Sequence, residues 1–99
     1  MILVVGTVEL PSGGLEKLLP AAATVIGETR NEDGCIRYAY ARDILNPDLM
    51  HVSEAWRDLD ALIAHSKTEH MKIWGAAVGE VGVIKRDLKR YDTDEGIAI

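Results

Sequence analysis

The sequence of 99 residues has no phenylalanine and a single cysteine, Cys35. A lone cysteine excludes an internal disulfide, so a reducing compartment such as the cytoplasm is the expected location. We interpret Cys35 itself as a small buried residue. Hydrophobic residues still make up 47% of the chain and are spread along it, which predicts one small folded domain.

Basic charge is also scarce. Lysine and arginine total 11 against 16 acidic residues, which gives a net charge of −5 at pH 7. Nucleic acid binding requires a basic face that neutralises phosphates, so a nucleic acid partner is not expected. The basic residues Lys85, Arg86, Lys89 and Arg90 are interrupted by Asp87, and we expect them to line a solvated strand edge.

Long hydrophobic runs are missing as well. The N-terminal stretch MILVVGTVEL has no basic leader and is broken at Glu9. It is predicted to be neither a signal peptide nor a membrane span, so a soluble cytoplasmic protein without a membrane partner is expected.

The common signatures of metal and phosphate sites are not found. His65 and His70 are five residues apart across an expected helix break, and His51 lies on an expected strand. No cysteine or carboxylate completes a recognisable ligand spacing, so no metal is predicted. Glycine-rich phosphate motifs, a P-loop and a Ser-His-Asp order are also absent.

The residues that are present predict two helices among four strands. Apolar alternation and turn residues such as Asn46-Pro47-Asp48 mark the strands, and apolar residues at helical spacing mark the first helix, which contains Pro20 and should be kinked or delayed by it. On the second strand Ile36, Tyr38 and Tyr40 should share one face. The expected strands are 1–10, 35–42, 49–57 and 81–91, and the helices are 14–31 and a segment that starts after the N-cap Asp58.

This order is that of a ferredoxin-like α+β fold, in which an antiparallel four-stranded sheet carries its helices on one face. The first strand is apolar on both faces, with Ile2 and Val4 on one side and Leu3 and Val5 on the other. Because helices cover only one face, we expect a second copy of the chain to cover the other, giving a sheet-to-sheet homodimer.

The stretch ALIAHSKTEHMKIW, residues 61–74, is predicted to be two helical pieces. Ser66 and Glu69 fit a capping box, so a new helix should begin near Lys67 and His65 should end the preceding one. A helix C-terminus favours a protonated imidazole and an N-terminus a neutral one, so His70 is the better candidate for a general base. The alternative is that both histidines are capping or surface residues and that Trp74 belongs to the core.

Three segments together resemble the antibiotic biosynthesis monooxygenase family. They are RNEDGCIRY at 30–38, Glu54-Ala55-Trp56, and DLDALIAHSKTEHMKIW at 58–74, and the resemblance extends over residues 2–91. It implies one ferredoxin-like domain over 1–99 with a tail at 92–99, a homodimer, and a pocket between sheet and helices. Some members of this family oxidise hydroquinone-type aromatics with molecular oxygen and without metal, flavin or haem.

The resemblance therefore implies a cofactor-free oxidation of a small aromatic substrate by O2. Deprotonation of a phenol gives an electron-rich anion that can pass an electron to oxygen, which requires a base, a flat apolar pocket and donors for the oxygenated intermediate. The residues that would serve are His70 as base, His65 as second imidazole or anion donor, Glu54 to orient a hydroxyl or a histidine, and Trp56, Trp74, Tyr38 and Met71 as pocket wall. Glu54 and Trp56 are equally explained as packing at the strand-to-helix junction, and Tyr38 as core.

Other activities of the family give alternatives. Its haem-degrading members use a set of residues that is missing here, because Thr7, His65 and Gly75 stand at the corresponding places. An isomerase that acts on a small carbonyl or sugar-like signal could use the two histidines as proton shuttles. A non-catalytic dimer that binds small aromatics is the third alternative.

Overall fold

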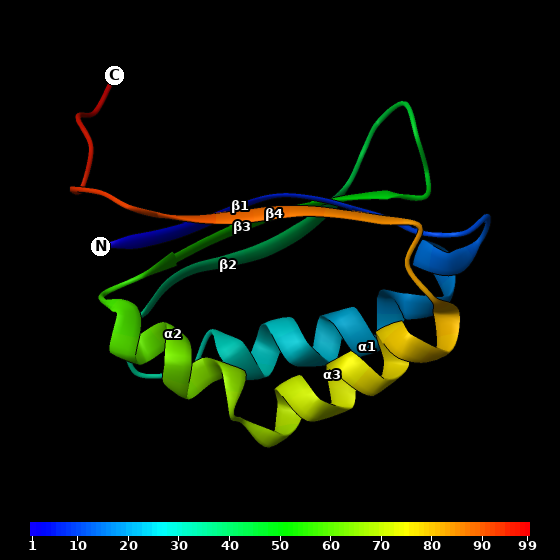
Figure 1. Cartoon of the computed structure of the whole chain (residues 1–99), viewed down its shortest axis with the longest axis horizontal. Helices are drawn as coiled ribbons and strands as arrows, with labels where there is room; N and C mark the ends of the chain where they lie inside the picture. Colours follow the sequence, from blue (N-terminus) through cyan, green and yellow to red (C-terminus); the bar gives the residue numbers. More distant parts are fainter.

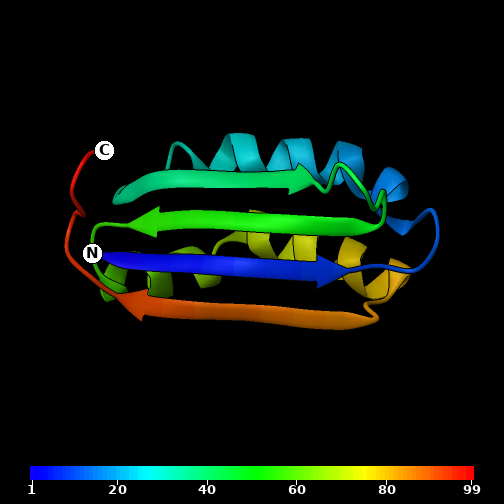
Figure 2. The ribbon, with the colours of Figure 1, turned by 90° about the horizontal axis from the view of Figure 1, so that it is seen from above.

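The computed structural model describes all residues 1–99 and contains a four-stranded sheet and three helices. The sheet order is β2-β3-β1-β4 and every neighbouring pair is antiparallel. This is the expected ferredoxin-like α+β architecture, with the second predicted helix divided in two (Figures 1 and 2). The elements are β1 Ile2–Glu9, α1 Gly14–Thr29, β2 Cys35–Arg42, β3 Leu49–Trp56, α2 Leu59–Ser66, α3 Glu69–Val81 and β4 Lys85–Asp92.

All three helices lie on one face of the sheet and leave the other face uncovered (Figure 1). The core lies between α1, α3 and the sheet, where apolar side chains alternate with outward-facing ones along each strand. A smaller cluster at the other end of the sheet packs Ile2, Tyr38 and Trp56 against Ala61 of α2. The buried residues of the larger cluster are Val8, Leu10, Leu15, Leu18, Ala22, Val25, Met50, Val52 and Trp74.

Helix α1 is held by a stripe of apolar residues that includes Leu15, Leu18, Ala22 and Val25, all buried. The helix runs through Pro20 from its regular start at Gly14, so the predicted delay does not occur. It ends at Thr29, two residues earlier than expected.

Strand β2 contains a register shift between Cys35 and Arg37, so Ile36 is an extra residue relative to β3. The prediction that Ile36 shares a face with Tyr38 and Tyr40 is therefore wrong. Ile36 is 60% exposed, whereas Tyr38 is buried. A bulge displaces the two-residue alternation that the prediction assumed.

The break between α2 and α3 is confirmed, but it is capped differently from the capping box that we expected. The side chain of Thr68 accepts a hydrogen bond from the backbone N–H of Met71, so Thr68 is the N-cap and α3 begins at Glu69. The Ser66 hydroxyl instead donates to the carbonyl oxygen of Ile63 within α2. As predicted, Asp58 caps the start of α2 by accepting from Ala61 N–H.

Strand β4 begins at Lys85, four residues later than predicted, because Val81 is still helical. Gly82 ends α3 with φ of 86°, a left-handed value that glycine adopts without strain. No helix of the chain is long and apolar enough to span a membrane.

Candidate active site

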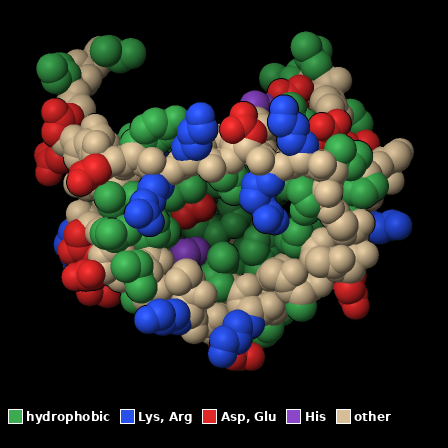
Figure 3. All heavy atoms as spheres, in the orientation of Figure 1, with side chains coloured by type: hydrophobic (Ala, Val, Ile, Leu, Met, Phe, Trp, Pro, Cys, Tyr) green, Lys and Arg blue, Asp and Glu red, His purple; other side chains and the backbone are tan.

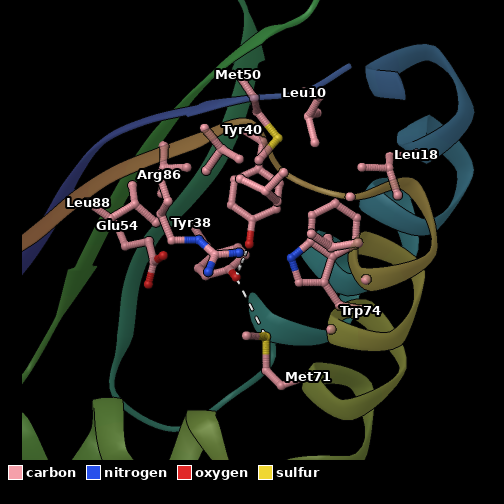
Figure 4. Close-up of a pocket in the computed structure, with 17 residues that line it drawn as sticks. Leu10, Leu18, Tyr38, Tyr40, Met50, Glu54, Met71, Trp74, Arg86 and Leu88 are labelled. Atoms are coloured by element: carbon pink, nitrogen blue, oxygen red, sulfur yellow. Dashed lines mark hydrogen bonds between the residues drawn. The ribbon is translucent and has the colours of Figure 1, made fainter. Parts of the chain in front are cut away.

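A cavity of about 550 Å³ lies between the sheet and α3, and hydrophobic residues make up 12 of the 17 that line it. Figure 3 shows the hollow as a mostly apolar surface with Lys and Arg side chains around its rim, one acidic side chain exposed inside and one histidine side chain at its border. Its size falls in the range of small-molecule sites in proteins. The lining combines β-strand residues with one face of α3 (Figure 4).

Two stacked aromatic rings form part of the cavity wall. Tyr40 of β2 and Trp74 of α3 stack with ring centroids 5.4 Å apart and planes tilted by 27°. Both rings are held because β2 and α3 pack against the same core, and both line the cavity (Figure 4). A planar ligand fits such a surface best, since stacked aromatic contacts favour flat partners.

The hydroxyl groups of Tyr38 and Tyr40 meet at the polar side of this wall and hydrogen-bond to each other. Tyr38 Oη also lies 3.8 Å from the Met71 sulfur, a contact drawn in Figure 4. Burial raises the pKa of Tyr40 to about 12 and raises the pKa of Tyr38 further. Both phenols are therefore neutral at physiological pH and can act as hydrogen-bond donors to a bound oxygen atom.

The carboxyl group of Glu54 is the acidic group of the cavity lining. Glu54 is buried on β3, and Glu54 Oε1 accepts a hydrogen bond from Trp56 Nε1 at 3.0 Å. Burial raises the pKa of Glu54, and the Trp56 bond opposes that rise. A carboxylate with a raised pKa is a stronger base than an exposed one, which suits it to proton transfer near neutral pH.

Arg86 is exposed on the edge strand β4, as expected, and it also lines the cavity. It faces the helices because β4 pairs with β1 so that Arg86 lies opposite Val8 and Leu88 opposite Gly6. Figure 4 shows the guanidinium of Arg86 and the carboxyl of Glu54 both directed into the cavity. The site thus contains one buried acid and, apart from it, one cation that can neutralise a developing anion.

The two histidines are close together, but neither is among the residues that line the cavity. His65, in the last turn of α2, and His70, in the first turn of α3, both contact the same oxygen of Glu32. His65 Nδ1 lies 2.7 Å and His70 Nε2 2.8 Å from Glu32 Oε2. Their ring centroids are 6.2 Å apart.

The loop that carries Glu32 is fixed by a tight turn at Gly34. Its φ is 84°, and a Cβ added there would lie 2.6 Å from the Cβ of Ala61. The carbonyl of Gly34 also accepts from the backbone N–H of Arg57 at 2.8 Å. The turn therefore holds the loop against the start of α2.

Of the predicted site residues, Tyr38, Glu54, Met71 and Trp74 lie in the cavity wall. Trp56 does not, because it is completely buried, and its indole N–H donates to Glu54. The roles assigned to all of them remain predictions.

Sequence reasoning missed Tyr40, Arg86 and Glu32. The alternation of Tyr38 and Tyr40 on one strand was a usable signal for Tyr40. Alternation of Arg86 with Leu88 would likewise have indicated an inward arginine. Nothing local in the sequence marks Glu32, since its partners lie more than thirty residues further along the chain.

Comparisons with known proteins agree on the family and the fold. The sequence model of the antibiotic biosynthesis monooxygenase family matches residues 1–77. A search of curated proteins finds no match.

Several crystal structures superpose on almost the whole chain. A Deinococcus radiodurans protein named for the same family is 24% identical with a TM-score of 0.89, covering 100% of this chain and 98% of its own. A Caulobacter crescentus protein named likewise is 25% identical with a TM-score of 0.85, covering 95% and 90%. A conserved Methanosarcina mazei protein is 24% identical with a TM-score of 0.84, covering 94% and 92%. From the match over residues 1–77 and this shared fold, we conclude that the chain belongs to the antibiotic biosynthesis monooxygenase family.

Proposed function

We propose that the cavity binds a flat dihydroxyaromatic compound and that the protein oxidises it with O2 without a cofactor. The observation that carries this proposal is the buried Glu54 carboxyl at the wall of an apolar cavity bounded by the stacked Tyr40 and Trp74 rings. Membership of a monooxygenase family supports the reaction type.

The cavity favours a small aromatic substrate over a sugar-like one. Its lining is mostly apolar, and the polar groups gather around Glu54, Arg86 and the hydroxyls of Tyr38 and Tyr40. A substrate with a flat apolar body and hydroxyl groups at its edge matches that division. A carbohydrate, polar on every side, would leave many hydroxyls facing hydrocarbon.

Glu54 is the base that the geometry favours. It faces the cavity, whereas His65 and His70 turn their nearer ring nitrogens to Glu32. In the proposed reaction Glu54 accepts the phenolic proton, and Arg86 stabilises the resulting oxyanion. His70 remains the alternative base and is included in the test below.

The chemistry balances with oxygen as the sole co-reactant. The substrate anion passes an electron to O2, and the resulting radical pair combines to form a bond between oxygen and a ring carbon that carries hydrogen. The O–O bond then breaks, the ring carbon loses its proton, and water leaves. A hydroquinone thus becomes a hydroxyquinone, one oxygen atom enters the ring and the other is reduced to water.

The experiment is to measure O2 consumption and quinone formation with a panel of hydroquinones and dihydroxynaphthalenes in metal-free buffer. We expect one quinone and one water per O2, with a rate that falls sharply in Glu54→Gln and persists in the exposed control variant His51→Gln. Loss of the rate in His70→Gln alone would move the role of base to His70. Tight binding with no turnover of any substrate would identify a binder, and deuterium exchange into a hydroxyketone without O2 uptake would identify an isomerase.

We further propose that the active form is a homodimer joined through the uncovered sheet face. Val5 and Tyr91 are exposed on that face, since both pair on the side opposite the helices. In Figure 1 the 43–48 hairpin loop and the 93–99 tail both extend to this same side. Ile44 and Leu45 in the loop are almost fully exposed, and so are Ile97 and Ile99 in the tail.

Analytical sedimentation should give twice the mass of one chain, and Val5→Lys should reduce that mass to the mass of the monomer. A parent protein that sediments as a monomer would contradict the proposal.

A further inference from the structure

We propose that Glu32, His65 and His70 form a binding site for one divalent transition-metal ion of the zinc class. The three residues come from the α1–β2 loop, the end of α2 and the start of α3. Their ligand atoms, one carboxylate oxygen and two imidazole nitrogens, all lie within 4.8 Å of one another. This site is separate from the cavity and does not depend on the oxidation proposed above.

The donor set is one that zinc uses. Two imidazoles and one carboxylate bind zinc tetrahedrally, and the fourth position is left for water. Harder ions such as Mg²⁺ and Ca²⁺ prefer sites made of oxygen alone, so the two nitrogen donors select against them.

The two contacts with Glu32 require only a small adjustment to admit the ion. Zinc lies about 2.0–2.2 Å from nitrogen and oxygen ligands, so tetrahedral ligand atoms are separated by about 3.3 Å. The contacts from Glu32 Oε2 to His65 and His70 are 2.7 and 2.8 Å. An opening by about half an ångström therefore makes room for the ion.

The three side chains are already held and largely shielded from water. Their exposed fractions are 4% for His65, 14% for Glu32 and 18% for His70. The imidazole of His65 packs against the rings of Trp56 and Tyr38, with centroids at 4.6 and 5.2 Å. Ligands that are oriented before binding lose less freedom when the metal arrives.

Charge and access also favour a cation. The carboxylates of Glu32 and Glu54 are close enough for the charge of Glu32 to raise the pKa of Glu54, and neither forms an ion pair with a lysine or arginine. A pocket of about 280 Å³ reaches Glu32 from the surface and is also lined by Asp33, Asp60 and Arg57. Arg57 pairs with Asp33, which leaves Asp60 as the second acidic group without a basic partner there. A hydrated cation therefore has a partly acidic route to the site.

The test is to titrate chelator-treated protein with Zn²⁺ by calorimetry and to record the visible spectrum with Co²⁺. We expect one Zn²⁺ per chain, a higher Tm in its presence, a tetrahedral Co²⁺ spectrum, and no response to Mg²⁺ or Ca²⁺. Glu32→Gln and His70→Gln should each weaken binding by at least about a hundredfold, since even residues that only support metal ligands cost 10- to 100-fold.

His51→Gln is the matched control, because His51 pairs with Asp43 at 2.8 Å on the exposed surface and offers only two donors. It should bind Zn²⁺ like the parent protein. Absence of Zn²⁺ binding, or binding that Glu32→Gln and His70→Gln leave unchanged, would overturn the proposal and leave the cluster as a hydrogen-bonded brace. Glu32 and His70 are both more exposed than His65, so they are replaced and the buried His65 is left unchanged.

Discussion

The cavity and the Glu32 cluster are adjacent but are built in different ways. Tyr38 separates them, with its ring centroid 5.2 Å from that of Tyr40 on one side and 5.2 Å from that of His65 on the other. The cavity is apolar and contains a buried carboxyl whose pKa is raised, whereas the Glu32 cluster places a carboxylate directly against two imidazoles. A carboxyl without a cationic partner suits proton transfer, and one that converges with nitrogen donors suits ion binding.

The largest expected effect is a loss of oxidation rate when the carboxyl group of Glu54, and not that of Glu32, is replaced. Glu54→Gln keeps the side-chain volume and an acceptor for Trp56 Nε1 but removes the base, so kcat should fall by about 10²- to 10⁴-fold with little change in KM. Steady-state O2 consumption with the best aromatic substrate measures it. An unchanged kcat would show that Glu54 does not take the proton.

The two tryptophans should differ in their effect on stability. Trp56 is completely enclosed, so Trp56→Ala should lower the free energy of unfolding by about 3–5 kcal/mol. Trp74→Ala should cost less, because one side of that ring already borders the cavity. Urea unfolding of both variants compares them, and a larger loss for Trp74→Ala would show that the cavity is filled more tightly than described here.

The pH dependence of the rate should sharpen the contrast further. The ionised form of Glu54 is the active base, so kcat should rise with pH through a pKa that burial raises above 4.5. The Trp56 hydrogen bond lowers that pKa, and Trp56→Phe removes it. The acidic limb of the profile should therefore move to higher pH in Trp56→Phe; a limb that moves to lower pH, or does not move, would count against Glu54 as the titrating group.

The smallest expected effect concerns the helix start that joins the two regions. Thr68→Ala should cost about 1 kcal/mol of stability because it removes the N-cap of α3, whose first turn carries both His70 and Met71. Ser66→Ala should cost less, since Ser66 caps no helix. Thermal unfolding distinguishes the two, and the reverse order would restore the capping box predicted from the sequence.

The sequence predicted the fold well because periodicity and turns are local properties. The element order, the Asp58 cap and the break between His65 and His70 all follow from residues within a few positions of each other. The exposure of Ile36 could not be predicted in this way, because the bulge at this residue depends on the pairing of β2 with β3. The resemblance to the family indicated Glu54 and Trp74 as site residues, and both lie in the cavity wall.

What the sequence could not predict was the direction in which the histidines point. Their partner, Glu32, lies on a loop whose position depends on the turn at Gly34 and on the contact of that turn with Ala61. A contact between segments that are far apart in the sequence leaves no pattern among neighbouring residues. The same holds for Arg86, whose inward direction is set by the pairing of β4 with β1.

The chain has only two indole groups, and each one belongs to a different region. Trp74 lines the cavity, and Trp56 lies against the imidazole of His65. Replacing either one by phenylalanine would leave a single tryptophan, which can be excited selectively over the three tyrosines. The fluorescence of Trp74 would then report on aromatic ligands, and that of Trp56 on quenching by a paramagnetic ion such as Cu²⁺. Binding in the cavity and at the Glu32 cluster can therefore each be followed by intrinsic tryptophan fluorescence, without an attached dye.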